Sequence, residues 1–209
     1  MPQVSVIIPL MRPHRIAPVV ASIQESTEDY EIIVVATGEC ADAARDLPVI
    51  LLEDDGGTWP VRINRGYLAT TAPSFVTGAD DLDFRPGWFE AVQQTMSTLP
   101  DGGGVIALND LYNSNGVHFV IQREYIESFG GYKDAPGIVV FPGFKHQYSD
   151  DAIRLTAQNR GRFAYCNEAI VEHLHPGAGK SEMDATYALG ESTGAYDQIV
   201  FRDNSELWV

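Results

Sequence analysis

Apolar runs alternate along the first hundred residues with segments whose apolar positions have helical spacing. Apolar residues recur three or four positions apart in residues 16–23 and 88–96, which predicts helices there, and residues 62–71 can form another. Short apolar runs, two of them rich in β-branched residues, predict buried strands between these segments. These runs are Val4–Ile8, Glu31–Val35, Val49–Leu52 and Ser74–Thr77. Strands that alternate with helices are typical of an α/β fold with a parallel, doubly wound sheet.

The second half of the chain has a less regular pattern. Apolar runs predict strands at residues 105–108, 119–121, 163–165 and 169–173. A helix is predicted over residues 149–160, with Ser149 as its N-cap and Gly161 as its C-cap. The helix over residues 88–96 should end before Pro100 and the glycine run 102–104. We expect a single domain with two halves that divide near residue 100.

Acidic and polar residues follow several of the predicted strands. They are Pro9, Thr37–Gly38, Asp54–Asp55 and Asp80–Asp81. Ligands of such sheets bind at the carboxyl ends of the strands, so these residues predict one binding edge. Unpaired buried charge is costly, and the pair Asp80–Asp81 therefore predicts a hard divalent cation. The simpler alternative is a solvated loop near a helix N-terminus, and we assign Asp83 to it as an acid that approaches the next helix.

Two histidines, His173 and His175, follow the last predicted strand. Alternate residues of an extended chain point to opposite faces, so only one of them can easily face a given site. A lone histidine is usually structural, but beside the inferred carboxylates His173 becomes a candidate metal ligand. An imidazole ligand there would favour Mn over Mg.

Asp150 and Asp151 open the helix predicted over residues 149–160. Acids in a first turn often only complement the helix dipole. Alternatively, one of them takes the proton from an acceptor hydroxyl as a general base, and the sequence leaves both alternatives open. Arg62 and Arg65 are either solvated or charge partners of a metal-bound diphosphate.

The segment Gly177–Ser181 ends like a phosphate-binding P-loop. That motif also needs a glycine at the position of Leu174, and too few residues follow for the rest of its sheet. We therefore predict a flexible loop here, in which Lys180 lies near phosphate.

Composition restricts the possible binding partners and the expected cellular compartment. The 209 residues are 44% hydrophobic, which suffices for a sizeable core, and their formal net charge is −15. Such an acidic chain is a poor match for tight non-specific contact with duplex nucleic acid or an anionic membrane. We find no secretory signal and no run near the ~20 apolar residues of a membrane span, and predict a cytoplasmic protein. Cys40 and Cys166 lack metal-ligand spacing and are expected to be reduced thiols.

An ordered set of short motifs resembles a family 2 glycosyltransferase of the GT-A fold. The set covers most of residues 1–175, and its members run in the family's order, each weak alone. The motifs are Val4–Pro9, Glu31–Val35, Asn64–Gly66, Ala79–Asp81 with Pro86–Gly87, Ser149–Asp150 and Val171–His173. The resemblance implies a mostly parallel GT-A-like sheet over residues 1–209. Its nucleotide-sugar-binding half spans about 1–100, and its acceptor-side half and C-terminal tail span about 101–209.

The resemblance also implies the roles of individual residues. Asp81 and Asp80, with His173, would hold Mn or Mg on the donor diphosphate. Asp150 would be the general base of an inverting transfer, with Asp151 as the alternative. The donor, expected to be a UDP-sugar, would be bound by six residues. These are Pro9, Thr37, Gly38, Arg62, Asn64 and Asp80.

Several positions depart from the family's pattern. An acid is usual where Ala36 or Thr37 stands, which leaves the donor base open, and the first motif acid is replaced by Ala79. The glutamate before the base is replaced by Ser149. Residues 80–88 and 172–176 also look like short glycosyltransferases of tailed bacteriophages, which would imply an acceptor on a virion protein or a modified DNA base.

We therefore expect a metal-dependent, inverting glycosyltransferase whose acceptor is a glycan, a protein or a modified DNA base. One alternative is a nucleotidyltransferase on a similar sheet, although the basic residues 11–15 lack the glycines that its loop needs. The other is a non-catalytic nucleotide-sugar or glycan-binding module, which the substitutions Ala79 and Ser149 invite.

Overall fold

One eight-stranded sheet organises the protein. The computed structural model describes residues 1–101 and 103–209, so Gly102 of the predicted glycine run lies outside the described residues. The strands are β1 (Val4–Pro9), β2 (Tyr30–Ala36), β3 (Ile50–Glu53), β4 (Ser74–Thr77), β5 (Leu82–Phe84), β6 (Val105–Asn109), β7 (Phe119–Gln122) and β8 (Phe163–His173). Their order across the sheet is β3-β2-β1-β4-β7-β6-β8-β5.

The sheet is mixed but mostly parallel. β1 pairs in parallel with β2 and β4, β2 pairs in parallel with β3, and β6 pairs in parallel with β8. β7 runs antiparallel to β4 and β6, and β5 runs antiparallel to β8. The parallel half, β1 to β4, brings the carboxyl ends of its strands to one edge, as the alternating pattern predicts.

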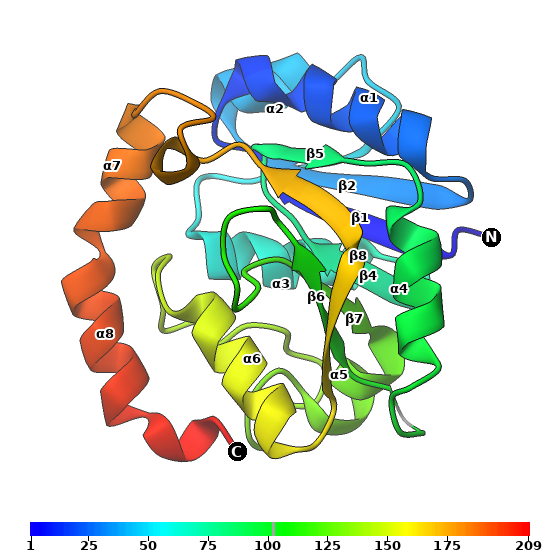
Figure 1. The fold of residues 1–209 in the computed structure, drawn as a ribbon. Coiled ribbons are helices and arrows are strands. Elements are labelled where there is room, and N and C mark those ends of the chain that lie inside the picture. Colours follow the sequence, from blue (N-terminus) through cyan, green and yellow to red (C-terminus); the bar gives the residue numbers. More distant parts are fainter. Residues whose placement is uncertain (102) are drawn as a thin grey trace.

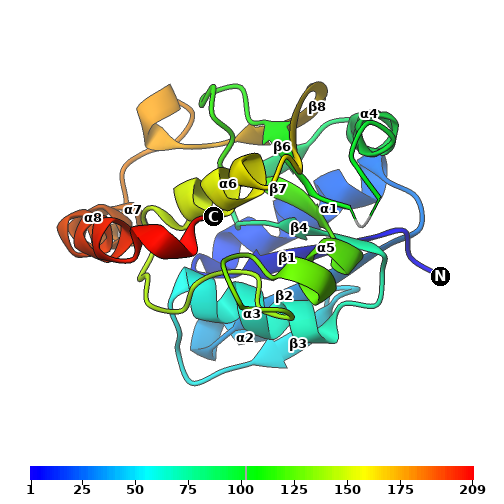
Figure 2. The same ribbon diagram turned by 90° about the horizontal axis from the view of Figure 1, so that it is seen from below.

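Helices cover both faces of the sheet (Figures 1 and 2). They are α1 (Ile16–Ser26), α2 (Gly38–Ala44), α3 (Trp59–Ala69), α4 (Trp88–Met96), α5 (Arg123–Phe129), α6 (Ser149–Asn159), α7 (Ala185–Ser192) and α8 (Gly194–Asp203). Buried residues of α1, α2 and α4 share one apolar cluster, and those of α3, α5 and α6 share another on the opposite face. The sheet therefore lies between two cores.

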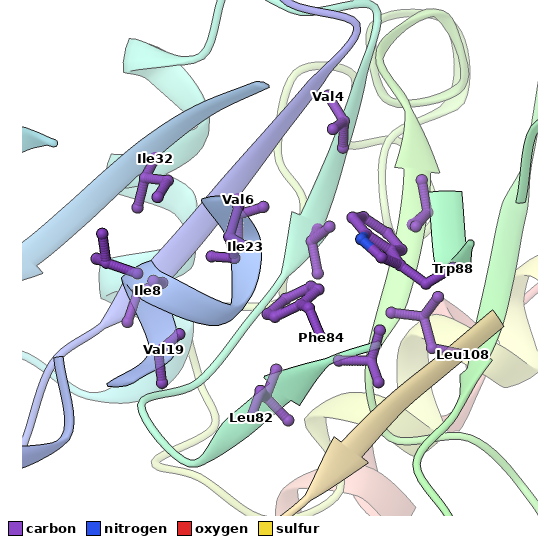
Figure 3. Packing of buried hydrophobic residues seen from close by; sticks show 14 of the residues in the cluster. Val4, Val6, Ile8, Val19, Ile23, Ile32, Leu82, Phe84, Trp88 and Leu108 are labelled. Atoms are coloured by element: carbon purple, nitrogen blue, oxygen red, sulfur yellow. The ribbon is translucent and has the colours of Figure 1, made fainter. Parts of the chain in front are cut away.

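Strand β1 contributes to both cores because its side chains alternate between the faces. Val4, Val6 and Ile8 belong to the cluster under α1, and Ile7 belongs to the cluster under α3. Figure 3 shows the first cluster, in which Trp88 is fully buried. Continuous apolar runs in the sequence therefore correspond to strands that are buried on both faces.

Four local predictions differ from the structure. The run Val49–Leu52 is not buried: β3 is an edge strand, and Ile50 is 43% exposed. Asp83 does not approach a helix but lies in β5, paired with Glu172. Residues 163–165 and 169–173 form one strand, because the register with β6 shifts at Asn109 and pairing continues beyond the break. Ser149 lies inside α6, and its hydroxyl donates to His146 O, so it is not the N-cap.

The C-terminal helices α7 and α8 were not predicted. They run along one side of the molecule, next to the carboxyl edge of the parallel strands (Figure 1). The chain then returns to α6, where Trp208 is buried against Phe144 and Ala152. None of the described helices has the length and apolarity needed to cross a bilayer.

Candidate active site

A cavity of about 390 Å³ opens at the carboxyl edge of the sheet. Its walls come from the ends of β1, β4 and β8, from the start of α6, and from α7. The polar residues that matter most in its lining are Arg12, Asp80, Asp81, Asp150, His173 and Tyr187. Of the strand-end residues that the sequence singled out, Pro9, Asp80 and Asp81 line this cavity.

Gly78 brings the acidic pair to this edge. Its N–H donates to Ile7 O of β1 at 3.0 Å, and a Cβ at this position would lie 2.5 Å from that oxygen. Only glycine allows so close an approach of the two backbones. The chain then turns away from β4 and presents Asp80 and Asp81, which are 2% and 4% exposed.

Both carboxylate oxygens of Asp80 have partners within the protein. Its Oδ2 accepts hydrogen bonds from the backbone N–H groups of Met11 and Arg12, each at 2.8 Å. Its Oδ1 contacts Arg12 Nη1 at 2.5 Å. Burial raises the pKa of Asp80, and Arg12 opposes that rise. Asp80 thus anchors the loop after β1 and has no free oxygen for a metal.

Arg12 is the cation at the centre of the cluster. Its side chain is 7% exposed and contacts Asp80 at 2.5 Å, Asp184 at 2.7 Å and Asp81 at 3.7 Å. Burial alone would lower the pKa of Arg12, but the neighbouring carboxylates outweigh it and raise the pKa. Three carboxylates around one guanidinium formally leave two negative charges.

Asp81 has one engaged and one free oxygen. Its Oδ2 accepts a hydrogen bond from Tyr187 Oη at 2.8 Å and lies 3.4 Å from His173 Nε2. Its Oδ1 is buried and has no hydrogen-bond partner among the described residues. Burial would raise the pKa of Asp81, but His173, His118 and Tyr187 together lower it well below its ordinary value. Asp81 is therefore ionised and holds an unpaired oxygen.

His173 lies beside Asp81, with further polar groups around it. Within the part of the chain that the structure describes, His173 Nδ1 has no hydrogen-bond partner, and it lies 4.0 Å from Asp110 Oδ2. His118 packs edge-on against His173 and holds Thr77 O through Nδ1 at 3.1 Å. Burial, and next the charge of His173, lower the pKa of His118 to about 4, so it is neutral at pH 7. His175 stacks on Tyr112 and also lines the cavity, so both histidines face it, contrary to the expectation from strand alternation.

The structure separates the two acids of α6. Asp150 lines the cavity, where burial, and next the charge of Asp151, raise its pKa to about 6. Asp151 is absent from the lining of the cavity, and its carboxylate pairs with Arg154 on the same helix. Of the two, Asp150 is in position to reach a bound substrate.

Other predicted donor-binding residues are spread more widely. Pro9 and Arg62 line a second, more apolar cavity of about 230 Å³, which shares Pro9 and Trp59 with the first. Arg62 is held there by two hydrogen bonds to the Asp54 carboxylate, at 2.9 and 3.0 Å. Thr37 and Gly38 line neither cavity.

Asn64 also lies outside both cavities. Its Oδ1 accepts from the N–H groups of Val139 and Val140, and its Nδ2 donates to Val140 O. These hydrogen bonds fix the backbone of the loop at Val139–Val140, so the role of the Asn64 side chain is structural.

Three residues of the site were not predicted. Arg12 was noted only as part of a basic stretch, and its contacts with Asp80 and Asp81 bridge 68 and more positions of sequence. Asp184 and Tyr187 belong to a helix whose apolar pattern is weak. The sequence signal that could have indicated this helix is Asp184, a good N-cap residue. It caps α7 by accepting hydrogen bonds from the N–H groups of Thr186 and Tyr187.

A divalent cation fits the site in part. Within residues 1–101 and 103–209, no three histidine, cysteine or acidic side chains come together as a ready-made metal centre. Asp81 Oδ1 nonetheless has no hydrogen-bond partner among these residues, and His173 places Nε2 3.4 Å from Asp81 Oδ2. The three carboxylates around Arg12 formally leave a charge of −2. Carboxylate donors suit Mg and Mn. A cation at Asp81 would take its remaining ligands from a bound substrate or water.

Comparison with known proteins places the fold. No family model matches the sequence, and no curated protein matches it. Among solved structures, a mannosyltransferase of Pyrobaculum calidifontis in complex with GDP-Man and Mn²⁺ superposes with a TM-score of 0.61 at 18% identity. The match covers 82% of this chain but only 56% of that enzyme, so this chain spans little more than half of its length.

A second similar structure is glucosyl-3-phosphoglycerate synthase of Mycobacterium tuberculosis. Its complex with Mn²⁺, UDP and glucosyl-3-phosphoglycerate has a TM-score of 0.60 at 14% identity, covering 90% of this chain and 75% of that one. Its complex with Mg²⁺ and UDP has a TM-score of 0.59 at 14% identity, covering 90% and 74%. At this level of identity the likeness concerns the fold, and the protein has the α/β fold of GT-A glycosyltransferases.

Proposed function

We propose that the protein is a metal-dependent, inverting glycosyltransferase, which moves a sugar from a nucleotide-sugar donor to an acceptor hydroxyl. One observation carries the proposal. Asp81, with its free oxygen, and Asp150, with its raised pKa, line the same cavity at the carboxyl edge of a GT-A sheet. A cation-binding acid and a proton acceptor in one cavity are what this reaction needs.

Asp150 is the proposed general base. Because its pKa is about 6, it is ionised at pH 7 and accepts a proton more readily than an ordinary aspartate. It takes the proton of the acceptor hydroxyl as that oxygen bonds to the anomeric carbon. The bond from this carbon to the donor phosphate breaks at the same time, and the nucleoside diphosphate leaves from the opposite face.

The two adjoining cavities suit the two ends of the donor. We assign the nucleoside to the apolar cavity lined by Pro9, Trp59 and Arg62, and the diphosphate and sugar to the larger one. Asp81 and His173 would hold Mn or Mg, which neutralises the negative charge of the departing diphosphate when it is bound. The donors of the two similar enzymes, GDP-Man and UDP-glucose, are the first to test.

A non-catalytic nucleotide-sugar-binding module is the second candidate. It is favoured by Asp80, which uses both carboxylate oxygens on Arg12 and the loop after β1, so that Asp81 alone of the pair has a free oxygen. A protein of this kind binds the donor but does not break it.

The test is to incubate the protein with GDP-mannose or UDP-glucose and Mn²⁺, and to identify the nucleotide released by slow hydrolysis or transfer. We expect nucleoside diphosphate, and we expect Asp150→Asn to keep donor binding and lose turnover. Pyrophosphate among the products supports a nucleotidyltransferase instead. Binding without turnover by the parent chain supports the non-catalytic module, and parental turnover by Asp150→Asn refutes the assignment of the base.

A further inference from the structure

The C-terminal segment places its own anion on the buried cation of the site. Asp184 Oδ2 accepts a hydrogen bond from Arg12 Nε at 2.7 Å, across 172 positions of sequence. The Asp184 side chain is 36% exposed, whereas that of Arg12 is 7% exposed. Arg12 is thus fixed inside the site, and Asp184 reaches it from the solvent side.

The same segment covers Asp81 through Tyr187. The Tyr187 hydroxyl donates to Asp81 Oδ2 at 2.8 Å, and its ring lies against the Arg12 guanidinium at 3.9 Å. Tyr187 is only 8% exposed and lines the cavity. One turn of α7 therefore contacts both Arg12 and Asp81.

A carboxylate oxygen and a phosphate oxygen make the same kind of charge-assisted hydrogen bond to a guanidinium. Asp184 is therefore an internal competitor for any phosphate that approaches Arg12. Its departure also removes one of the three carboxylates around Arg12 and lowers the negative charge that would repel the phosphate. Because Asp184 is already partly exposed, its charge can return to water without crossing a buried region.

We propose that the Asp184 carboxylate occupies a phosphate position on Arg12, and that a diphosphate displaces it and loosens α7 from the cavity. This inference deepens the proposed function and rests on it in one respect: the diphosphate is taken to be that of a nucleotide-sugar donor. Arg12 becomes a diphosphate-binding residue, and α7 becomes a cover whose contact with the site depends on what is bound there.

The test replaces the charge of Asp184 and keeps its helix cap. Asn and Ser are both good N-caps, so Asp184→Asn and Asp184→Ser should retain α7. Pyrophosphate binding is measured by calorimetry in EDTA, which separates Arg12 from any metal. Both variants should bind pyrophosphate about tenfold more tightly than the parent, since a competing charge-assisted hydrogen bond is lost.

Glu182→Gln is the matched control. It removes the same charge two residues earlier, from an exposed side chain that lines neither cavity and forms no ion pair within the described residues. It should leave pyrophosphate affinity within about twofold of the parent, since exposed charges are screened by salt. If both Asp184 variants bind pyrophosphate like the parent, or if Glu182→Gln matches their gain, the competition does not exist.

Two further measurements separate this proposal from the proposed function. In the parent, pyrophosphate should speed hydrogen exchange of the α7 amides, and unchanged or slower exchange would show that the cover stays in place. UDP and GDP are titrated alongside pyrophosphate, and tighter binding of either shows that a nucleoside site adjoins Arg12. If the Asp184 variants bind pyrophosphate more tightly but no nucleotide sugar binds, the anion site on Arg12 is supported and the proposed glycosyltransferase function is refuted.

Discussion

Replacing Asp150 with asparagine should stabilise the protein at alkaline pH while it removes catalysis. In the folded chain the pKa of Asp150 is about 6, against an ordinary value of 3.8. The unfolded chain therefore loses this proton at a lower pH than the folded chain does. The resulting penalty on the folded state is absent below pH 3.8, grows from 3.8 to 6, and is complete above 6.

The size of the effect follows from the shift. A difference of about two pKa units corresponds to roughly 3 kcal/mol at pH 8. Because the side chain is only partly buried, solvent reduces this figure, and we expect Asp150→Asn to gain about 2 kcal/mol at pH 8. At pH 5 the penalty is incomplete, so the gain should be smaller by about 1 kcal/mol.

The assay is urea unfolding of the parent and Asp150→Asn at pH 5 and pH 8, with turnover of the donor measured on the same samples. Asp151→Asn is the control, because Asp151 carries the same charge on the next residue but pairs with Arg154 outside the cavity. Because the charge of Asp151 is the smaller of the two causes that raise the pKa of Asp150, Asp151→Asn should show a weaker stabilisation at pH 8 than Asp150→Asn does. If the stability that Asp150→Asn gains over the parent is no larger at pH 8 than at pH 5, the pKa of Asp150 is not raised in the folded chain.

Three further variants test the fold around the site. Trp88→Ala should lower the free energy of unfolding, measured in urea, by about 3–5 kcal/mol. The reason is that the buried indole packs on Phe84 and donates a hydrogen bond to Thr27. A loss under about 1 kcal/mol would contradict this packing. Asn64→Ala should cost about 2 kcal/mol without changing donor affinity, because the amide holds backbone groups of the loop at Val139–Val140; weaker donor binding in calorimetry would return Asn64 to the donor site. Gly66→Ala should destabilise by about 1–3 kcal/mol, because its Cβ would lie 2.3 Å from Ile7 Cγ2, and an unchanged thermal midpoint would show that the two elements can separate.

The parallel half of the fold could be predicted from sequence because its strands are buried on both faces. Val4–Pro9 and Ser74–Thr77 are short, largely apolar runs that are buried at every position, and the residues after them share one edge of a parallel sheet. The edge strand β3 was harder to place. Leu51 and Leu52 are as apolar as core residues, and nothing in the sequence says that no strand pairs on their outer side.

The chemistry of the site could be predicted only where one short segment carries it. Asp80 and Asp81 stand out locally, and so does the acidic start of α6. The different roles of Asp80 and Asp81 depend on Arg12, which reaches them through the tertiary fold. The cover formed by α7 was missed for the same reason. Exposed Leu189 weakens the apolar pattern of this helix, and Tyr187 reaches Asp81 only in the folded chain.

The central claim is that a nucleotide sugar and a divalent cation bind together at Asp81. Thermal unfolding with a panel of nucleotide sugars, with and without Mn²⁺, tests it most directly. A donor at ~100 times its dissociation constant should stabilise the protein by roughly 2.7 kcal/mol. We predict that at least one donor does so only with Mn²⁺, and that Asp81→Asn abolishes the effect. If no donor shifts the transition in a metal-dependent way, the account is contradicted.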